Sequence, residues 1–320
     1  MTTATVIVPA RNAADMIGEC IKSLRAQTVP VEIIIVDDGS DDGTAALAKK
    51  LGAKVLRQQK KGPASARNLG AGAAKGEVLL FTDADCVPES GWVEMMLVPF
   101  SDRSIAGAQG AYKTRQKSWV ARFAQLEIED RYDRLSKREY IDFIGTYSAA
   151  YRKTVFMKAG GFDENFTAAS GEDPELSFRV AGAGGKMVFT PRAIVYHRHP
   201  DSLAKYAKQK FGRALWRVPL YKKHMKKAAG ESYTPQSLKV ETGLFLMFAI
   251  SLAAWPIWAG RAPPGFSPEI FLGAIVLLSL PFAAKNFRKD KPAGLVTPFM
   301  VVVRSAVFSA GLLWGMLKRQ

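Results

Sequence analysis

The sequence predicts an α/β fold with a mainly parallel sheet flanked by helices, followed by an α-helical membrane domain. Two short apolar runs, Thr5 to Pro9 and Val31 to Val36, lie on either side of a helical pattern from Ala14 to Ala26. This alternation of strand and helix is the order expected of a parallel sheet. The run Glu77 to Thr82 continues the series, and strongly apolar segments begin only after about Tyr233.

Each of these three predicted strands ends in polar side chains, which are Arg11 and Asn12 after the first, Asp37 and Asp38 after the second, and Asp83 and Asp85 after the third. Open parallel sheets bind their ligands beyond the carboxyl ends of the strands. We therefore expect the three strand ends to meet at one binding site.

The acidic pair Asp83 and Asp85, on either side of Ala84, comes where an apolar strand opens into a loop. One carboxylate there can bind Mg²⁺ or Mn²⁺ directly, while the ion keeps water and substrate phosphate oxygens in its other positions. The second carboxylate can orient a ribose or a metal-bound water. A solvated turn has the same spacing, so the pair needs support from other residues.

Five short motifs supply that support, in the order Val36-Asp37-Asp38-Gly39-Ser40, Ala66-Arg67-Asn68-Leu69-Gly70, Thr82-Asp83-Ala84-Asp85, Gly160-Gly161-Phe162-Asp163 and Gly171-Glu172-Asp173-Pro174-Glu175-Leu176. With these motifs, the chain from about Thr2 to His199 resembles glycosyltransferase family 2, the inverting nucleotide-sugar transferases of the GT-A fold. The resemblance implies a Rossmann-like GT-A domain that binds a UDP- or GDP-sugar together with Mn²⁺ or Mg²⁺.

The resemblance also implies roles for single residues. Pro9 and Asp38 are expected around the nucleotide base, Arg67 on the base or phosphate, Asp83 on the ribose, and Asp85 on the metal. The whole predicted donor-binding set is Pro9, Arg11, Asn12, Asp37, Asp38, Arg67, Asp83, Ala84 and Asp85, and the predicted metal ligands are Asp85, Asp83 and His197. His197 is included because some relatives place a histidine after the last strand of the sheet, and the alternative is an ordinary strand-end hydrogen bond.

Glu172 and Asp173 are the predicted catalytic pair. Transfer of a sugar to a hydroxyl requires removal of the hydroxyl proton as the anomeric carbon is attacked, so a carboxylate must serve as general base. We assign this role to Asp173 and expect Glu172 to orient Asp173 or the acceptor. Both residues also suit the start of a helix from Pro174 to Ala183, where acids are favoured and proline is common.

The general base favours a hydroxyl acceptor over a polyprenyl phosphate, because a phosphate acceptor is already an anion. Three residues are assigned to the acceptor or diphosphate side of the site, namely Ser148, Arg213 and Trp216. Ser148 stands where many relatives have asparagine. Gln209, Arg213 and Trp216 resemble a Gln-x-x-Arg-Trp signature with altered spacing, which leaves processivity open, and packing of an ordinary helix is the alternative for them.

Three apolar segments, 242–260, 268–284 and 294–317, are predicted to cross a membrane. At roughly 1.5 Å per residue the third is long enough for a hydrocarbon core of about 30 Å, whereas the second is short. The basic loop from Lys285 to Lys291 is expected inside, which places the carboxyl terminus outside. Lys318 and Arg319 argue against that last placement, and buried helices of a soluble domain are the alternative for all three segments.

The formal charge of +16 is concentrated between Ser202 and Gly230, where basic residues alternate with apolar ones and no acid occurs. We expect interfacial helices on anionic headgroups there. The adjoining apolar segments make a nucleic-acid partner the weaker interpretation. The charged stretch Trp119 to Tyr140 is expected to be mostly a solvated helix face, with a lid or acceptor wall as the alternative.

The predicted organisation has three parts, a GT-A domain over 1–200, basic interfacial helices over 201–239 and transmembrane helices over 240–320. No secretory leader is recognised and Cys20 and Cys86 imply no disulfide framework, so we expect a multi-pass protein of the inner (plasma) membrane with a cytoplasmic catalytic domain.

The predicted function is metal-dependent transfer of a hexosyl group from a nucleotide sugar to a hydroxyl of a membrane lipid or lipid-linked saccharide. A polyprenyl-phosphate sugar synthase and a non-catalytic membrane scaffold with a transferase-like domain remain the alternatives. The sugar, the nucleotide base and the acceptor are left open, because each depends on a few contacts from loops.

Overall fold

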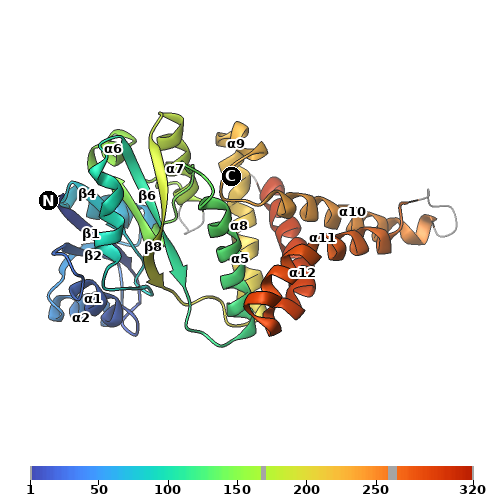
Figure 1. Ribbon diagram of the computed structural model, residues 1–320, viewed down its shortest axis with the longest axis horizontal. Coiled ribbons are helices and arrows are strands. Elements are labelled where there is room, and N and C mark those ends of the chain that lie inside the picture. The colour runs from blue at the N-terminus through green and yellow to red at the C-terminus, as the bar shows by residue number, and fades with distance from the viewer. Residues whose placement is uncertain (1, 167–170, 259–264, 319–320) are drawn as a thin grey trace. The chain divides into compact units, whose positions relative to one another are not determined.

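The computed structural model describes residues 2–166, 171–258 and 265–318, and it separates into two compact units that interleave along the chain (Figure 1). The sheet unit contains Met1–Arg115, Tyr132–Arg198 and Lys226–Tyr233, and the helical unit contains Gln116–Arg131, His199–Met225 and Thr234–Gln320. The three-part division predicted from the sequence assigns Gln116–Arg131 to the GT-A domain, whereas in the structure these residues belong to the helical unit.

The sheet unit has eight strands in the order β3-β2-β1-β4-β7-β6-β8-β5. Their bounds are β1 Ala4–Ala10, β2 Glu32–Asp38, β3 Lys54–Gln58, β4 Val78–Phe81, β5 Val87–Pro88, β6 Ile105–Lys113, β7 Ala149–Arg152 and β8 Lys186–Tyr196. Strands β3, β2, β1 and β4 run parallel, as do β6 and β8, while β7 is antiparallel to both neighbours and β5 is antiparallel to β8. The predicted α/β class with a mainly parallel sheet is confirmed.

The helices of the sheet unit follow the alternation seen in the sequence. They are α1 Ile17–Arg25, α2 Thr44–Lys50, α3 Pro63–Ala73, α4 Trp92–Leu97, α6 Lys153–Lys158 and α7 Glu172–Gly182, with short 3₁₀ turns η1 Val98–Ser101 and η2 Thr146–Ser148. In the short helix α9, Met225–Ala229, the first residue belongs to the helical unit and the others belong to the sheet unit. Helix α3 lies close to β1 because Gly70 has no side chain: a Cβ there would come within 2.4 Å of Ile7 Cγ2. This close approach packs the second half of α3 against Ile7 of β1 and Val36 of β2.

The helical unit is built from α5 Trp119–Leu135, most of which belongs to it, α8 Leu203–Lys223, α10 Gln236–Trp258, α11 Pro268–Lys289 and α12 Lys291–Leu317. Among the described residues, α10, α11 and α12 are long and apolar enough to cross a membrane. They contain the three predicted segments, except that residues 259 and 260 of the first, and 319–320 at the end of the predicted membrane domain, lie outside the described residues.

Helix α5 differs from the expected solvated face. Val120, Phe123 and Ala124 are buried in a cluster with Tyr206 of α8 and Met300 of α12. The solvated face was predicted because α5 is rich in charged residues. In the structure Glu127 instead forms ion pairs with basic residues of α8 and α12. Sequence periodicity does not reveal such partners when they lie far away in the chain.

Candidate active site

A cavity of about 490 Å³ opens at the carboxyl ends of the parallel strands. Its wall contains the predicted residues Pro9, Arg11, Asp38, Arg67, Asp83, Asp85 and His197, together with Ala10, Lys60, Lys61, Gly62 and Pro63. The structure thus brings together most of the donor and metal residues that the sequence predicts. Lys60 and Lys61 were missed as site residues, although the glycine turn that follows them marks this loop.

The loops after β1 and β2 are tied to each other. The Asn12 backbone N–H donates to Ser40 Oγ at 3.0 Å, and the side-chain oxygen of Asn12 accepts from the Asp41 N–H at 3.1 Å. Asn12 has a positive φ of 47°, a conformation that asparagine tolerates better than most residues. Asn12 therefore shapes the loop that carries Arg11 into the cavity wall.

The neighbours Asp37 and Asp38 have different surroundings. Asp37 is fully buried and accepts from Arg57 Nε at 2.9 Å. Asp38 accepts from the backbone N–H groups of Lys61 and Gly62 at 2.8 and 2.9 Å, and from the side chain of Gln58. Asp38 thus fixes the turn that forms one wall of the cavity. Asp37 instead binds Arg57 and the Ser40 N–H, and its predicted donor contact stays a prediction.

Arg67 is buried on α3 between two carboxylates. It donates from Nη2 to Asp83 Oδ1 at 2.8 Å and from Nη1 to Glu172 Oε1 at 3.0 Å. Burial opposes the charge, but the negative charges of Asp83, Asp173 and Glu172 hold the pKa of Arg67 above its ordinary value. The guanidinium stays charged and sets the position of Asp83 relative to Glu172.

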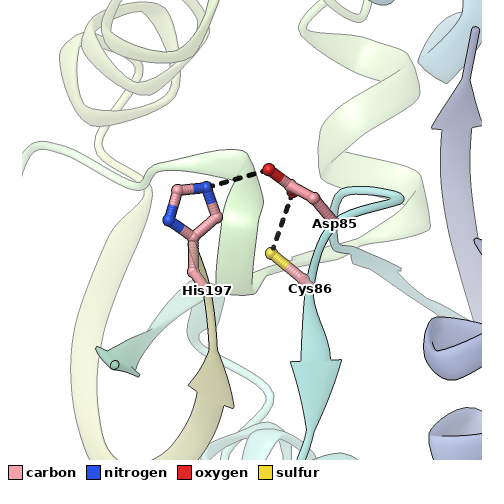
Figure 2. Close-up of side chains that lie close together, drawn as sticks. All are labelled: Asp85, Cys86 and His197. Atoms are coloured by element: carbon pink, nitrogen blue, oxygen red, sulfur yellow. Dashed lines mark hydrogen bonds and ion pairs between the residues drawn. The ribbon is translucent and has the colours of Figure 1, made fainter. Parts of the chain in front are cut away.

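Asp85, Cys86 and His197 form a cluster whose ligand atoms all lie within 4.8 Å of one another (Figure 2). His197 Nε2 is 3.2 Å from Asp85 Oδ2, and Cys86 Sγ is 3.7 Å from Asp85 Oδ1. Burial raises the pKa of Asp85, yet the interactions with His197 bring it below the ordinary value. An ionised carboxylate beside an imidazole is a donor set that suits a divalent cation such as Mn²⁺.

Asp83 is not part of this cluster in the structure, because its Oδ1 is bonded to Arg67. Cys86 joins the cluster although the sequence did not single it out as a ligand, and burial holds the pKa of its thiol well above the ordinary value. The fit to a divalent cation therefore rests on Asp85 and His197, and the ligand role of Asp83 stays a prediction.

An aromatic stack lies behind His197. The Tyr112 ring is stacked on Tyr147 at 3.4 Å between centroids and on His197 at 4.7 Å. The Tyr132 hydroxyl accepts from the Tyr112 N–H at 2.6 Å. The stack fixes the imidazole plane, and sequence reasoning missed it because the rings come from β6, η2 and the end of β8.

Asp173 lies in the first turn of α7, and its two carboxylate oxygens have different surroundings. Its Oδ2 accepts from the backbone N–H and the hydroxyl of Thr146 at 3.0 and 3.1 Å. Its Oδ1 is buried and has no hydrogen-bond partner within residues 2–166, 171–258 and 265–318. Burial and the nearby charge of Glu172 raise the pKa of Asp173 to about 7. A carboxylate of this kind is suited to accept a proton near neutral pH.

The three acceptor-side residues belong to different units, and their assignment to the acceptor stays a prediction. Ser148 is fully buried and accepts from Trp92 Nε1 at 2.8 Å, so its side chain joins η2 to α4. Arg213 and Trp216 are half-buried on α8 in the helical unit. Thr146, which was not predicted, is the η2 residue that contacts Asp173.

The fold and the site together define the GT-A class of α/β nucleotide-sugar transferases. Residues 5–160 match the family model described as glycosyl transferase family 2. This part of the chain therefore belongs to glycosyltransferase family 2, and the resemblance found in the sequence is confirmed.

Curated relatives agree with this assignment. The chain is 30% identical over 238 residues to the pre-mycofactocin glycosyltransferase of Mycobacterium tuberculosis, a match that covers 70% of this chain and 49% of that protein. It is 26% identical over 209 residues to glycosyltransferase AglE of Haloferax volcanii, covering 60% of this chain and 66% of AglE. The chain spans about half the length of the mycobacterial relative.

Solved structures share the fold. The mannosyltransferase PcManGT of Pyrobaculum calidifontis, in complex with GDP-Man and Mn²⁺, has a TM-score of 0.66 and 18% identity, and the match covers 100% of this chain and 88% of that one. GalNAc-T7 with UDP, GalNAc and Mn²⁺ has a TM-score of 0.50 and 20% identity, and covers 67% of this chain and 50% of its own. Both neighbours contain Mn²⁺, in agreement with a divalent metal.

Proposed function

We propose that this protein is an inverting hexosyltransferase that moves a sugar from a UDP- or GDP-sugar to a hydroxyl of a membrane lipid or lipid-linked saccharide. The reaction takes place at the cytoplasmic face of the inner membrane, to which the chain is anchored. The observation that carries the proposal is Asp173, a carboxylate with a raised pKa, one oxygen held by Thr146 and the other buried without a partner among the described residues.

The proposed reaction is a single displacement at the anomeric carbon. The acceptor hydroxyl transfers its proton to Asp173 Oδ1 while its oxygen forms the new bond to the anomeric carbon. The bond from that carbon to the nucleotide diphosphate breaks on the opposite face, so the anomeric configuration inverts. Asp85 and His197 would hold a divalent cation, which supplies charge neutralisation for the diphosphate when it is bound.

The cavity wall supports a nucleotide-sugar donor. Lys60, Lys61 and Arg11 bring positive charge to a wall that also contains Asp38 and Pro9. The basic side chains suit a diphosphate, and the aspartate beside backbone N–H groups offers acceptors for a base. A lipid acceptor is supported by the three long apolar helices and by the basic helix α8.

The test is nucleotide release by the detergent-purified full chain across a panel of UDP- and GDP-sugars. Total membrane lipid serves as acceptor, with Mn²⁺ or EDTA, and wild type is compared with Asp85→Ala and Asp173→Asn. Glu77→Gln is the matched control, because Glu77 is exposed at the opposite end of β4 from the site. Metal-dependent release that is lost in both site variants and kept in Glu77→Gln is the expected result.

Two other outcomes would redirect the proposal. Turnover that survives Asp173→Asn would favour a polyprenyl-phosphate acceptor, because a phosphate oxygen needs no general base. Nucleotide binding without release for any donor and lipid fraction would favour a non-catalytic scaffold.

A further inference from the structure

Four helices of the helical unit are joined by a buried ionic network. Arg304 of α12 donates to Glu127 of α5 at 2.8 Å and to Glu241 of α10 at 2.6 Å. Glu127 also accepts from Lys210 Nζ at 2.7 Å and from the Tyr206 hydroxyl at 3.0 Å, both on α8. The charge that Arg304 places inside an apolar segment is thus paired within the protein, and the network fixes α12 to α5 and α8.

Helix α12 follows α8 closely for most of its length. Met300 packs with Tyr206 near the start of α8, and Phe308 packs with Ala214 farther along. Toward the end, Gly311 and Gly315 face α8 so closely that an added Cβ would come within 2.7 Å of the Phe211 carbonyl oxygen and 3.0 Å of the Leu215 carbonyl oxygen. The two helices therefore form one layer, and α12 cannot enter hydrocarbon without α8.

Helix α8 is unsuited to hydrocarbon. Its 21 residues include Lys205, Lys208, Lys210, Arg213, Arg217, Lys222 and Lys223. Charged side chains are costly at the centre of a bilayer, whereas basic side chains are attracted to anionic headgroups at its surface. Because α12 is held against α8, the headgroup layer is the favourable position for both helices.

Helices α10 and α11 have the opposite character. They pack against each other and form a hairpin. The part of α11 near Phe282 packs on α12, and the far end of the hairpin extends away from α5, α8 and α12 (Figure 1). No charged residue occurs between Glu241 and the end of α10 at Trp258, or in α11 between Glu269 and Lys285. The most apolar 18-residue stretch of α10 and that of α11 are each 17% buried, whereas that of α12 is 44% buried.

Large apolar side chains are exposed all along the hairpin. They are Ile250, Leu252, Trp255 and Ile257 on α10, and Ile270, Leu277, Leu278 and Leu280 on α11. Leu252 lies on the side of α10 opposite to Ile250 and Ile257, since successive helical residues are separated by about 100°. Apolar surface that is exposed on several sides suits lipid better than a single protein partner. The charged residues of α11 are instead at its base, where Lys285 pairs with Asp130 and Lys289 pairs with Glu129.

We propose that the α10–α11 hairpin alone crosses the bilayer, while α12 stays on α8 in the headgroup layer. The end of α12 then lies on the same side of the membrane as the sheet unit. This differs from three crossings, which would place the carboxyl terminus on the other side. The inference rests on the proposed membrane attachment, and it follows from the even number of crossings: α10, α11 and α12 are the candidate spans among the described residues, and α12 is excluded from hydrocarbon by α8.

The test measures the side of the membrane on which single positions are exposed. Cysteines are introduced one at a time in the full chain by Lys318→Cys at the end of α12, Glu269→Cys at the start of α11 and Lys49→Cys on α2, all exposed positions. Each variant is treated with a membrane-impermeant maleimide in right-side-out and in inverted vesicles. The parent chain measures background, because its Cys20 and Cys86 are both buried.

We expect Lys318→Cys and Lys49→Cys to be labelled only in inverted vesicles and Glu269→Cys only in right-side-out vesicles. Labelling of Lys318→Cys from the side opposite to Lys49→Cys would overturn the proposal in favour of three crossings. Labelling of Glu269→Cys from the same side as Lys49→Cys would overturn the crossing by the hairpin. A protein that fractionates with the soluble phase would instead refute membrane attachment itself.

A second measurement does not depend on cysteine variants. A carboxyl-terminal affinity tag on the otherwise unchanged chain is digested with protease in sealed vesicles of both orientations. Loss of the tag in inverted vesicles alone supports the proposal, and loss in right-side-out vesicles alone overturns it.

Discussion

Replacing Asp173 with asparagine removes the proposed general base while keeping nearly the same shape. The amide can still accept the two hydrogen bonds that Thr146 donates to Oδ2. It cannot take up a proton from the acceptor at neutral pH. A positioned general base contributes about 10²- to 10⁴-fold to a rate, so we expect kcat of the Asp173→Asn variant to fall by about that factor.

The same substitution should stabilise the protein at alkaline pH. The pKa of Asp173 is raised from 3.8 to about 7, chiefly by burial, so ionising it costs the folded state about 4 kcal/mol more than the unfolded state. For a carboxyl with a raised pKa, the folded state binds more protons between about pH 4 and pH 7, and stability falls as the pH rises through that window. An asparagine carries no such cost.

The assay is thermal unfolding of wild type and Asp173→Asn in detergent, with EDTA and without nucleotide, over a series of pH values. At pH 8 we expect the variant to unfold at a temperature higher by about 8–16 °C, given about 4 kcal/mol and about 2–4 °C per kcal/mol for a domain of this size. The difference should vanish below about pH 4, where Asp173 is protonated in both states. A variant that is inactive but no more stable at pH 8 would refute the account of Asp173 as a buried base with a raised pKa, and a variant with wild-type kcat would refute its catalytic role.

The remaining predictions concern the groups around Asp173 and the metal. The log of kcat/KM for wild type should fall with unit slope below about pH 7, because Asp173 must be ionised to act as base; a profile that is flat down to pH 5 would contradict this. Thr146→Val removes a hydroxyl that donates to the charged carboxylate of Asp173, a loss of about 1.5–3 kcal/mol. We therefore expect kcat to fall roughly 10- to 100-fold with little change in donor KM, and the acidic limb of the pH profile to move to higher pH. Thr146→Ser keeps the hydroxyl and should restore both kcat and the position of the acidic limb. Binding of Mn²⁺, followed by calorimetry without donor, should be lost in Asp85→Ala and weakened in His197→Ala, and unchanged binding in both variants would exclude this cluster as the metal site. Arg67→Met should destabilise the protein by about 3–5 kcal/mol, because Glu172 is left as an uncompensated buried charge, and adding Glu172→Gln should recover part of the loss in denaturant titrations.

Local sequence patterns predicted the sheet unit well. Thr5 to Pro9 and Val31 to Val36 became β1 and β2 with small shifts of their ends, because continuous apolar runs bounded by turn residues have few alternatives to a buried strand. The polar residues at the strand ends were found for the same reason, since a parallel sheet gathers the carboxyl ends of its strands at one edge. The resemblance added the roles of Asp85 and Asp173, which spacing alone could not assign.

The contacts that control these groups were not predictable. Thr146 holds Asp173 from 27 positions away, and Tyr112 stacks on His197 across separate strands. The resemblance assigned Ser148 to the acceptor side, yet its hydroxyl accepts a hydrogen bond from Trp92 of α4. Such contacts depend on the order of strands in the sheet, which local periodicity does not determine.

The sequence by itself determined the α/β class, the family, the acidic strand ends and the three apolar helices, because each depends on short-range pattern or on motifs in a fixed order. The tertiary structure alone decided which charges are paired. Arg304, a costly residue within an apolar segment, is neutralised by Glu127 and Glu241, and Gly311 and Gly315 bring α12 onto a basic helix. Hydropathy treats a helix by itself, but whether it enters lipid depends on the helix packed against it, and that neighbour is known only from the fold.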